Sequence, residues 1–565
     1  MNIHIEGPLR KRLADIAANV QLAGNGRKLV EESIVCVAGY PDAHVDLLAD
    51  WSVNPFGSRS WQWTNAAFNF IPSLLAFHAQ GGGDRSIAFA VQALRSWDKA
   101  IRGPLKRYEF ARHDHATARQ AENLLFLLAY MVENDLAVDT WAQLEAAIHR
   151  HADALTEEEF YSRHTNHGVE QSRVLAMIAD FFPRHAASGM RMNLAIERLA
   201  SELATAFTKE GVHVENSPAY HSYVALSFIK IVDYFPPEKL GILREQIDAV
   251  MPKAMRFLTH IVRPDGEYPI IGDTQAVKAP NHFRRYSKTR EFSRLRYALS
   301  DGAAGAPSPE TVVLFPEAGY FIARDAWYPG GEGTQAFHLV LRSGYRSAYH
   351  RHDDDLSLIL YCGEDWLVDS GAYSYSEKDP IRRYMRSKWA HNVPVLMQPK
   401  AKRWDWELPT RSLPMRMLRR GDGTTMVRAT SHSYPGHVAM RDIEVVARLR
   451  EFWVTDALVP TEPSGRRRYL SLWHIPADKD IGIDGQSVEV VSRSTGNRLQ
   501  IDNMGPRAKS ISLLDPGVEG LDGPVMSRVS NKIEPVQLLA FEWAANHLHS
   551  ILRFRITGMA GGATA

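Results

Sequence analysis

Apolar residues recur at three- and four-residue spacing through most of the first 300 residues. Clear examples are IAFAVQALRSWDKAI, ARQAENLLFLLAYMVEND, SRVLAMIADFFP, NLAIERLASELATAF and IDAVMPKAMRFLTHIV. This spacing places the apolar side chains on one face of an α-helix. Short polar or Gly/Pro turns separate the segments, which favours antiparallel helical hairpins. No strict period relates the segments, so we predict no named helical repeat.

A segment of small and turn-forming residues, DGAAGAPSPE at 301–310, ends the helical pattern. Its composition predicts a linker. The runs that follow, such as TVVLF, GYFIARD, AFHLVLRSG and RRYLSLWHI, are β-branched, aromatic and often alternating, and they predict strands. We therefore predict an α+β multidomain chain, with helices in residues 1–300, a linker at 301–310 and an antiparallel β-sandwich in residues 311–565.

The length and the charge of the chain narrow its class. A chain of 565 residues suits two or three domains. Its formal net charge of +1 predicts no bulk affinity for nucleic acid or for an anionic membrane surface. No apolar run is long enough to predict a membrane span, and MNIHIEGPLRKRLADIAANV lacks the apolar core of a signal peptide. We therefore expect a cytoplasmic or periplasmic protein.

Cysteine count and the known cofactor motifs restrict the chemistry further. Cys36 and Cys362 lie in apolar surroundings, so we expect free buried thiols rather than a disulfide. GxGxxG, P-loop, GxSxG and HExxH motifs do not occur. Their absence argues against a nucleotide cofactor, a serine hydrolase and a zincin.

The segment Asn166-His167-Gly168-Val169-Glu170 opens a predicted helix. A purely structural interpretation makes Asn166 the helix cap and Glu170 a first-turn acid that the helix dipole favours. That interpretation does not account for His167. We therefore keep Asn166, His167 and Glu170 as candidate site residues.

A second segment, ENSPAYH at 215–221, contains a candidate catalytic tyrosine. Ser217 is predicted to cap a helix whose first residue is proline. Tyr220 would lie in the first turn, where the helix dipole would favour the phenolate of a group whose pKa is ordinarily about 10. The competing interpretation is a tyrosine packed on a neighbouring helix. Asn216 and His221 are candidate substrate-binding residues.

The densest polar group combines YHRHDDDLS from residue 349, DSG from 369 and HN from 391. Within it, LSLILYCGEDWLVDSG predicts two strands joined by a turn. Two histidines and one carboxylate from a sheet and its loops can form a metal site of N/N/O type, which suits zinc. The alternative for the HDDD run is a solvated acidic turn.

A fourth group consists of Trp61, Trp63, His115 and Arg119. Aromatic rings can stack on pyranose faces, and an arginine fork binds carboxylate or sulfate. These residues are therefore candidates for binding an acidic sugar. The competing interpretation is a set of interior aromatics beside the start of a helix.

Four segments in order, NHGVEQS, ENSPAYH, YHRHDDDLSLILYCGEDWLVDSGAY and SKWAHN, resemble the heparinase II/III-like family of polysaccharide lyases. The resemblance spans most of residues 50–475. It implies an incomplete (α/α) toroid followed by an antiparallel β-sandwich, in the helix-then-strand order already predicted. Members of the family cleave uronate-containing polysaccharides such as heparan sulfate or alginate, and several carry zinc in the β-domain.

The resemblance also implies roles for single residues. Asn166 and His167 would lie beside the substrate carboxylate, and Tyr220 would be the catalytic acid and base. His350 would face the active site, and Glu170 matches a residue found in some members only. Three residues would hold a zinc ion: His352, Asp369 and His391.

A second active-site tyrosine follows the Asp-Ser-Gly turn in parts of the family. Tyr384, Tyr373 and Tyr375 compete for this role here, and we prefer Tyr384. The HDDD run is more acidic than the family pattern. Charge repulsion would therefore disfavour a highly sulfated substrate near that loop.

The expected activity is β-elimination on an acidic polysaccharide or oligosaccharide, which leaves a 4,5-unsaturated uronate. Donors from Asn166 and His167 would stabilise the dianionic intermediate, each contributing roughly 3–4 kcal/mol. Tyr220 or a histidine would take the C5 proton, and Tyr220 would protonate the leaving oxygen.

Two other functions compete with this expectation. A glycoside hydrolase on the same scaffold would need two carboxylates about 5–10 Å apart, for which Glu170, Glu215 and Asp273 are candidates. A glycan-binding or assembly protein would need no catalytic set at all. The oligomeric states that remain compatible with the sequence include a homodimer.

Overall fold

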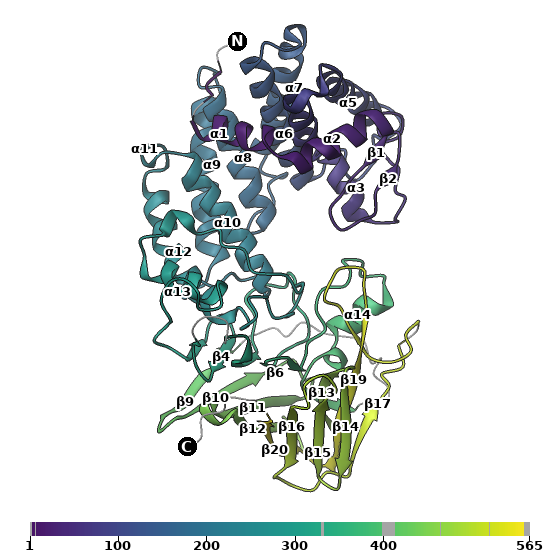
Figure 1. Ribbon diagram of the computed structural model, residues 1–565, viewed down its shortest axis with the longest axis vertical. Helices are drawn as coiled ribbons and strands as arrows, with labels where there is room; N and C mark the ends of the chain where they lie inside the picture. The colour runs from purple at the N-terminus through teal and green to yellow at the C-terminus, as the bar shows by residue number, and fades with distance from the viewer. Residues whose placement is uncertain are drawn as a thin grey trace. The chain divides into compact units, whose positions relative to one another are not determined.

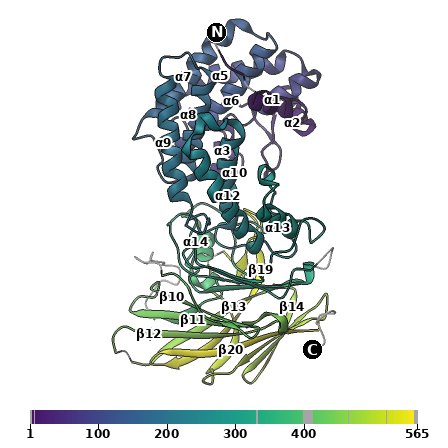
Figure 2. The ribbon, with the colours of Figure 1, turned by 90° about the vertical axis from the view of Figure 1, so that its left-hand side faces the viewer.

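The protein is described by a computed structural model that covers residues 3–5, 7–328, 333–397, 413–463, 465–518 and 520–558 (Figures 1 and 2). The chain forms two compact units. A helical unit comprises residues 1–206 and 227–247, and a β-rich unit comprises residues 207–226 and 248–565. Among the described residues, no helix combines the length and the apolar character needed to cross a bilayer.

Helices dominate the first half of the chain, as the spacing of its apolar residues predicts. Helix α6 packs against α7 and α8, and α8 packs in turn against α9. The elements up to residue 261 are α1 (Gly7–Ala17), α2 (Val20–Glu32), β1 (Ile34–Val35), β2 (Ala43–His44), α3 (Arg59–Ala66), α4 (Ile71–Phe77), α5 (Arg85–Arg102), α6 (Asp114–Glu133), α7 (Trp141–Thr156), α8 (Asn166–Phe181), α9 (Ser188–Ala206), α10 (Pro218–Tyr234), α11 (Pro237–Leu240) and α12 (Ile242–Ile261).

The burial pattern separates inner from outer helices. Nearly every residue of α6 and α8 is buried, whereas α7 and α9 bury one face. A helix buried all round needs neighbours on every side. These layers of inner and outer helices confirm the predicted incomplete (α/α) toroid.

Side-chain caps fix where the functionally interesting helices begin. The side chain of Thr165 accepts a hydrogen bond from the Gly168 amide at 3.2 Å, so the predicted cap at Asn166 is wrong and Asn166 is the first helical residue. The hydroxyl of Ser217 accepts one from the Tyr220 amide at 3.4 Å. This contact agrees with the predicted cap of α10.

The β-rich unit contains three larger antiparallel sheets. Its remaining helices are α13 (Arg290–Leu299) and α14 (Pro380–Arg386). Its strands are β3 (Val312–Phe315), β4 (Tyr320–Arg324), β5 (Phe337–Arg342), β6 (Ser357–Cys362), β7 (Asp365–Leu367), β8 (Pro394–Met397), β9 (Arg416–Gly421), β10 (Thr424–Ser431), β11 (His437–Val446), β12 (Glu451–Pro460), β13 (Arg467–Pro476), β14 (Lys479–Asp484), β15 (Ser487–Ser492), β16 (Arg498–Asn503), β17 (Ser510–Leu514), β18 (Val525–Met526), β19 (Glu534–Ala545) and β20 (Leu548–Thr557).

One apolar core joins these sheets into a sandwich. The strand orders are β3-β4-β5-β6-β7, β17-β19-β13-β8 and β14-β15-β16-β20-β12-β11-β10-β9. Phe321, Trp473 and Phe554, one from each sheet, belong to the same buried cluster, and the rings of Trp473 and Phe554 are 4.7 Å apart. The predicted antiparallel β-sandwich is therefore confirmed.

The strand pair that precedes Asp369 is also as predicted. Strands β6 and β7 are antiparallel neighbours, and Asp369 follows the second of them by two residues. Cys362, on β6, is a buried free thiol, while Cys36 is free and only partly buried. The domain boundary at residues 301–310 stays a prediction.

Candidate active site and metal centre

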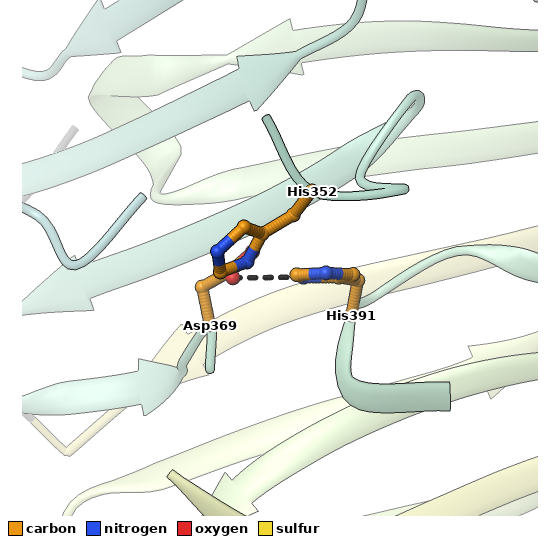
Figure 3. A group of neighbouring side chains, drawn as sticks. All are labelled: His352, Asp369 and His391. Carbon is orange, nitrogen blue, oxygen red and sulfur yellow. Dashed lines mark hydrogen bonds and ion pairs between the residues drawn. The ribbon is translucent and has the colours of Figure 1, made fainter. Parts of the chain in front are cut away.

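Three buried side chains in the β-rich unit converge as a metal site would require (Figure 3). His352, Asp369 and His391 are each at most 1% exposed, and each offers a ligand atom within 4.8 Å of the other two. His391 follows the short 3₁₀ turn Lys388–Ala390. The sequence-based grouping of these residues therefore agrees with the geometry.

The polar atoms of this group fit a zinc ion. Nδ1 of His391 lies 2.8 Å from Oδ1 of Asp369, whereas its buried Nε2 has no hydrogen-bond partner among the described residues. Burial alone would lower the pKa of His391, but the adjacent Asp369 carboxylate raises it. Two imidazoles and one carboxylate are a donor set that zinc accepts, with room for a further ligand.

The HDDD run is not the solvated acidic turn that one interpretation predicted. Asp353, Asp354 and Asp355 are each at most 4% exposed. Asp353 pairs with Lys388, and Asp355 accepts a hydrogen bond from Ser433 at 2.6 Å. Neither carboxyl oxygen of Asp354 has a partner among the described residues, and burial raises its pKa to about 6. Because these carboxyl groups face inward, the argument against a sulfated substrate does not hold.

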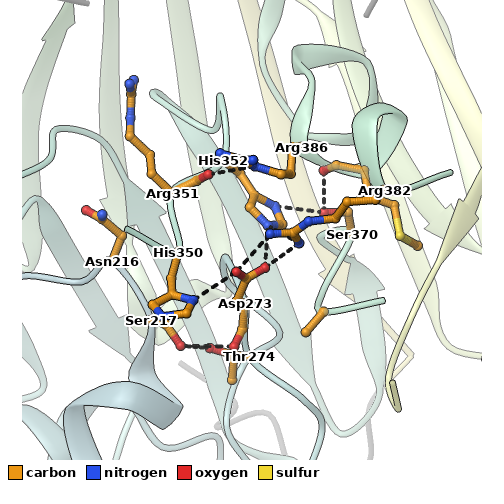
Figure 4. A network of polar contacts seen from close by, with 12 residues as sticks. Asn216, Ser217, Asp273, Thr274, His350, Arg351, His352, Ser370, Arg382 and Arg386 are labelled. Atoms are coloured by element: carbon orange, nitrogen blue, oxygen red, sulfur yellow. Dashed lines mark hydrogen bonds and ion pairs between the residues drawn. The ribbon is translucent and has the colours of Figure 1, made fainter. Parts of the chain in front are cut away.

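Asp273 links the metal group to His350 (Figure 4). Its Oδ2 lies 3.0 Å from Nδ1 of His350, and its Oδ1 lies 3.0 Å from Nε2 of His352. Arg382 binds both oxygens, one of them at 2.9 Å. Burial would raise the pKa of Asp273, but these hydrogen bonds hold it well below the usual range. Asp273 is therefore an ionised carboxylate shared by three partners.

Asp273 was predicted from sequence only as a candidate carboxylate of a hydrolase. Gly272 has a φ of +55°, and a Cβ there would lie 2.8 Å from the carbonyl oxygen of Asn216 and 3.0 Å from that of His350. Only glycine fits such a conformation and such a close approach. Gly272 was the feature of the sequence that could have pointed to Asp273. A glycine in this conformation marks backbone that packs closely against other segments, here those of Asn216 and His350.

Tyr220 and His350 form a stacked pair. Their ring centroids are 3.6 Å apart with an interplanar angle of 20°. The Tyr220 hydroxyl lies 3.1 Å from the hydroxyl of Tyr375. Burial, Tyr375 and the carboxylates of Asp273 and Glu215 raise the pKa of Tyr220 well above 10. The predicted stabilisation of a phenolate by the helix dipole is therefore outweighed, and Tyr220 is a protonated phenol at neutral pH.

The structure separates the three tyrosines that competed for the second role. Tyr384, the preferred candidate, is fully buried in an apolar cluster. Tyr373 packs against the same cluster. Tyr375 reaches Tyr220 and is 52% exposed. The contacts therefore favour Tyr375 over Tyr384.

Asn216 and His221 are committed to holding the backbone. The Asn216 amide donates to the carbonyl oxygens of Ser347 and Tyr349, at 2.8 and 3.0 Å. His221 is 1% exposed, and its two ring nitrogens contact the backbone of His213 and Ala254. We no longer count either residue as a candidate for binding sugar.

In the helical unit, His167 belongs to a cluster of rings at the starts of α6 and α8. The ring centroids of His167 and His115 are 4.5 Å apart in a stacked arrangement, and the centroid of Trp63 lies 4.8 Å from that of His115. Nδ1 of His167 lies 2.9 Å from Oδ2 of Asp114. Burial opposes the charge of Asp114, but His113 and His167 hold its pKa well below the usual range. This contact leaves Nε2 of the half-buried His167 available to a ligand.

Two other candidates of this unit do not face that cluster. Trp61 is 1% exposed and packs edge-on against Phe56, as its interpretation as a core residue predicted. Glu170 is 1% exposed, receives Arg173 at 2.6 Å and accepts a hydrogen bond from Ser227 at 2.8 Å. Glu170 is therefore a buried ion-pair partner, and the contacts give it no access to a substrate.

Comparisons with known proteins agree with this architecture. Residues 10–295 match the family model described as heparinase II/III N-terminus, and residues 307–518 match the one described as heparinase II/III-like, C-terminal. A heparin-sulfate lyase of Bacteroides stercoris is 23% identical over 383 residues, which is 61% of this chain and 55% of the relative. The chain thus spans about half the length of that curated relative.

Solved structures share the fold at low sequence identity. A crystal structure of heparinase III has a TM-score of 0.77 at 13% identity, with 96% of this chain and 86% of that chain covered. The heparan sulfate lyase HepC from Pedobacter heparinus has a TM-score of 0.66 at 18% identity, with 98% and 84% covered. Because the two family models together span most of its length, the chain belongs to the heparinase II/III-like family.

Proposed function

We propose that the protein is a polysaccharide lyase that cleaves a uronic-acid-containing glycan or oligosaccharide by β-elimination and leaves a 4,5-unsaturated uronate end. The stacked pair of Tyr220 and His350 carries the proposal, because it brings a phenol and an imidazole to 3.6 Å between ring centroids. β-Elimination needs one group that accepts a proton and one that donates it. The matched relatives that are named heparin-sulfate lyase support the same reaction class.

His350 is the proposed base for the C5 proton. Its Nδ1 lies 3.0 Å from Asp273, which directs the Nδ1 proton to that carboxylate and leaves the lone pair on Nε2. Nε2 lies 3.4 Å from Oε2 of Glu215. The two carboxylates stabilise the imidazolium that forms when the ring takes a proton.

Tyr220 is the proposed acid. Its raised pKa keeps the hydroxyl protonated until the C4–O4 bond breaks. The electron pair of the C5–H bond then forms the C4–C5 double bond, and the leaving oxygen takes the Tyr220 proton. Solvent returns a proton to Tyr220 and removes the one held by His350. The Tyr375 hydroxyl, 3.1 Å away, would donate to the transient phenolate.

The uronate carboxylate needs its own donors, because a carboxylate anion is a poor sink for the electrons from C5. We assign this role to Asn166 and to a His167 ring that donates from both nitrogens, from Nδ1 to Asp114 at 2.9 Å and from Nε2 to the uronate carboxylate. Such donors act in the same way as an oxyanion hole. Replacement of Asn166 by Ala should lower kcat about 10²–10³-fold.

Zinc is the proposed resident ion of His352, Asp369 and His391. When bound, it would fix the segment that carries both His352 and His350. Asp273 bonds to His352 and so completes the carboxylate–histidine arrangement that commonly orients metal ligands. The chemistry of proton transfer stays with the protein side chains.

A glycoside hydrolase is the alternative that the site supports less well. It would need one carboxyl group that is protonated and able to reach the leaving oxygen. Asp273 is instead ionised and bonded to His350, His352 and Arg382. Glu170 is held by Arg173.

The deciding experiment measures ultraviolet absorbance of the conjugated C4–C5 double bond during incubation with alginate, polyglucuronate, hyaluronan, chondroitin and heparan sulfate. A rise with any of them supports elimination, and Tyr220→Phe should abolish it without loss of fold. Tyr349→Phe is the matched control, because Tyr349 is 57% exposed. New reducing ends without absorbance would refute the lyase and favour the hydrolase.

A further inference from the structure

The helical unit contains a cavity of about 740 Å³ that the proposed reaction does not use. Its size falls in the range of small-ligand sites, roughly 300–1,000 Å³. Arg119, predicted from sequence to bind a sugar acid, lies on its wall. The walls come from α1, α4, α6, α8 and α10, and the lining residues do not include Asn166 or His167.

Most of the charges on the wall neutralise one another. Arg119 pairs with Glu122, which also receives Arg173 at 2.8 Å. On α1, Lys11 and Asp15 lie 2.8 Å apart. Glu122 thus neutralises Arg119, and Asp15 neutralises Lys11. The charge of Arg173 is balanced by Glu170, its second ion-pair partner.

Arg12 on α1 and Lys230 on α10 are the exceptions, and Lys230 lies beside the buried acids of α6 and α8. Its side chain is accessible from the cavity, and no hydrogen bond or ion pair holds its ammonium among the residues that the structure describes. Glu170 is close enough to act on it electrostatically, but the two oxygens of Glu170 are already bonded to Arg173 and Ser227. Lys230 is exposed on the cavity wall, and an ammonium without a counter-ion attracts an anionic ligand through Coulomb interaction.

The rest of the wall suits the other parts of a sugar. Phe126 and Tyr234 provide aromatic surface, and Met177 and Pro72 provide apolar surface. Ligand sites usually combine such apolar walls with a few placed polar groups. The amide of Asn123 adds a group that can both donate and accept hydrogen bonds.

We propose that this cavity binds a small sugar acid, of monosaccharide or disaccharide size, with the Lys230 ammonium as the contact for its carboxylate. The choice of a sugar acid rests on the proposed function, because elimination on a uronate glycan releases such molecules. Occupation of the cavity would let the protein bind its product apart from the residues assigned to the reaction.

Isothermal titration calorimetry with D-glucuronate tests the site, with D-glucose as the neutral probe. The protein should carry Tyr220→Phe, so that the result does not depend on turnover. We expect glucuronate to bind and glucose not to bind. Lys230→Met should weaken binding about tenfold to a hundredfold, the usual effect of losing a charged hydrogen bond. Lys28→Met, at a surface lysine that pairs with Asp42, should leave binding unchanged.

Further variants keep the test decisive. If Lys230→Met fails to fold, Arg12→Met serves instead, because Arg12 is an exposed cation on the same wall and should also weaken binding. The absence of glucuronate binding, or equal affinity in Lys230→Met, would overturn the proposal. Binding that is lost in His167→Ala but kept in Lys230→Met would overturn it too, because the sugar would then occupy the His167 cluster. Failure of the lyase assay would leave all these readouts intact.

Discussion

Replacement of Asp273 by Asn is the most informative perturbation of the β-rich unit. Asn keeps the size of the side chain but removes the charge that His350, His352 and Arg382 share. The Asp273 oxygens lie 3.0 Å from each histidine and 2.9 Å from the guanidinium. One amide oxygen can replace only part of these contacts, and the amide NH₂ would face donors.

The magnitude follows from the burial of Arg382, which is 3% exposed. Removing one partner of a buried ion pair typically costs about 3–5 kcal/mol, because the other charge stays buried without compensation. We therefore expect Asp273→Asn to destabilise the β-rich unit by about 3 kcal/mol. We also expect zinc affinity to fall about 10–100-fold, because His352 loses its orienting carboxylate.

Urea denaturation followed by circular dichroism measures the first effect, and zinc retention against a chelator measures the second. The double variant Asp273→Asn/Arg382→Met should recover stability but neither zinc affinity nor turnover. Asp265→Asn, at the partly exposed pair with Arg263, is the matched control. Full turnover and unchanged zinc retention in Asp273→Asn would refute the idea that this carboxylate couples the two groups.

Further predictions concern other parts of the two units. Tyr375→Phe should lower turnover several-fold, which corresponds to the loss of about one hydrogen bond, whereas Tyr384→Phe should lower stability alone. The reverse pattern in lyase and melting assays would make Tyr384 the second active-site tyrosine. His391→Ala should abolish zinc binding, as metal analysis of the purified protein would show, and retained stoichiometric zinc would contradict the site. Burial would raise the pKa of Glu122, but Arg119 and other cations hold it at about 2, and the pKa of Glu170 is likewise depressed. Both folded pKa values lie below the unfolded value of about 4.5, so the two carboxylates stabilise the fold above that pH and lose this effect as pH falls toward 2. The midpoint of acid unfolding should therefore shift in Glu122→Gln. An unchanged acid transition would contradict this account.

Local patterns were enough to predict the elements, whereas the three metal-site residues followed from the resemblance to the heparinase II/III-like family. Helical spacing and alternation depend on side chains close in sequence, and both carried over into the toroid and the sandwich. Strands β6 and β7 bring His352 and Asp369 together over a short hairpin, but the choice of these two residues and His391 came from the family resemblance. Burial at single positions was harder to predict. The sequence around Trp61 and Glu170 would be the same whether these side chains faced a core or a ligand.

Contacts between segments far apart in the sequence could not be predicted from local patterns. Asp273 lies 77 positions from His350 and 109 from Arg382, and no local pattern pairs them. The direction of the Tyr220 pKa shift was wrong for a related reason. The helix end is local and was counted, whereas burial, Tyr375 and Asp273 depend on other segments, and the effect of Glu215 within the same segment was not counted. The left-handed Gly272 was the one local sign of this convergence.

The division of the chain into units bears on how it can be handled in the laboratory. Residues 207–226, which contain Tyr220, belong to the β-rich unit although helices flank them on both sides in sequence. A fragment that starts after residue 300 would retain every strand from β3 onward but would lose Tyr220, Gly272 and Asp273. It would keep the three candidate metal ligands and lose residues assigned to the proposed reaction. Expression of the β-sandwich alone would thus yield a protein without activity, and complementation would have to supply Tyr220 and Asp273 from residues 207–299 together with Asn166 and His167 from the helical unit.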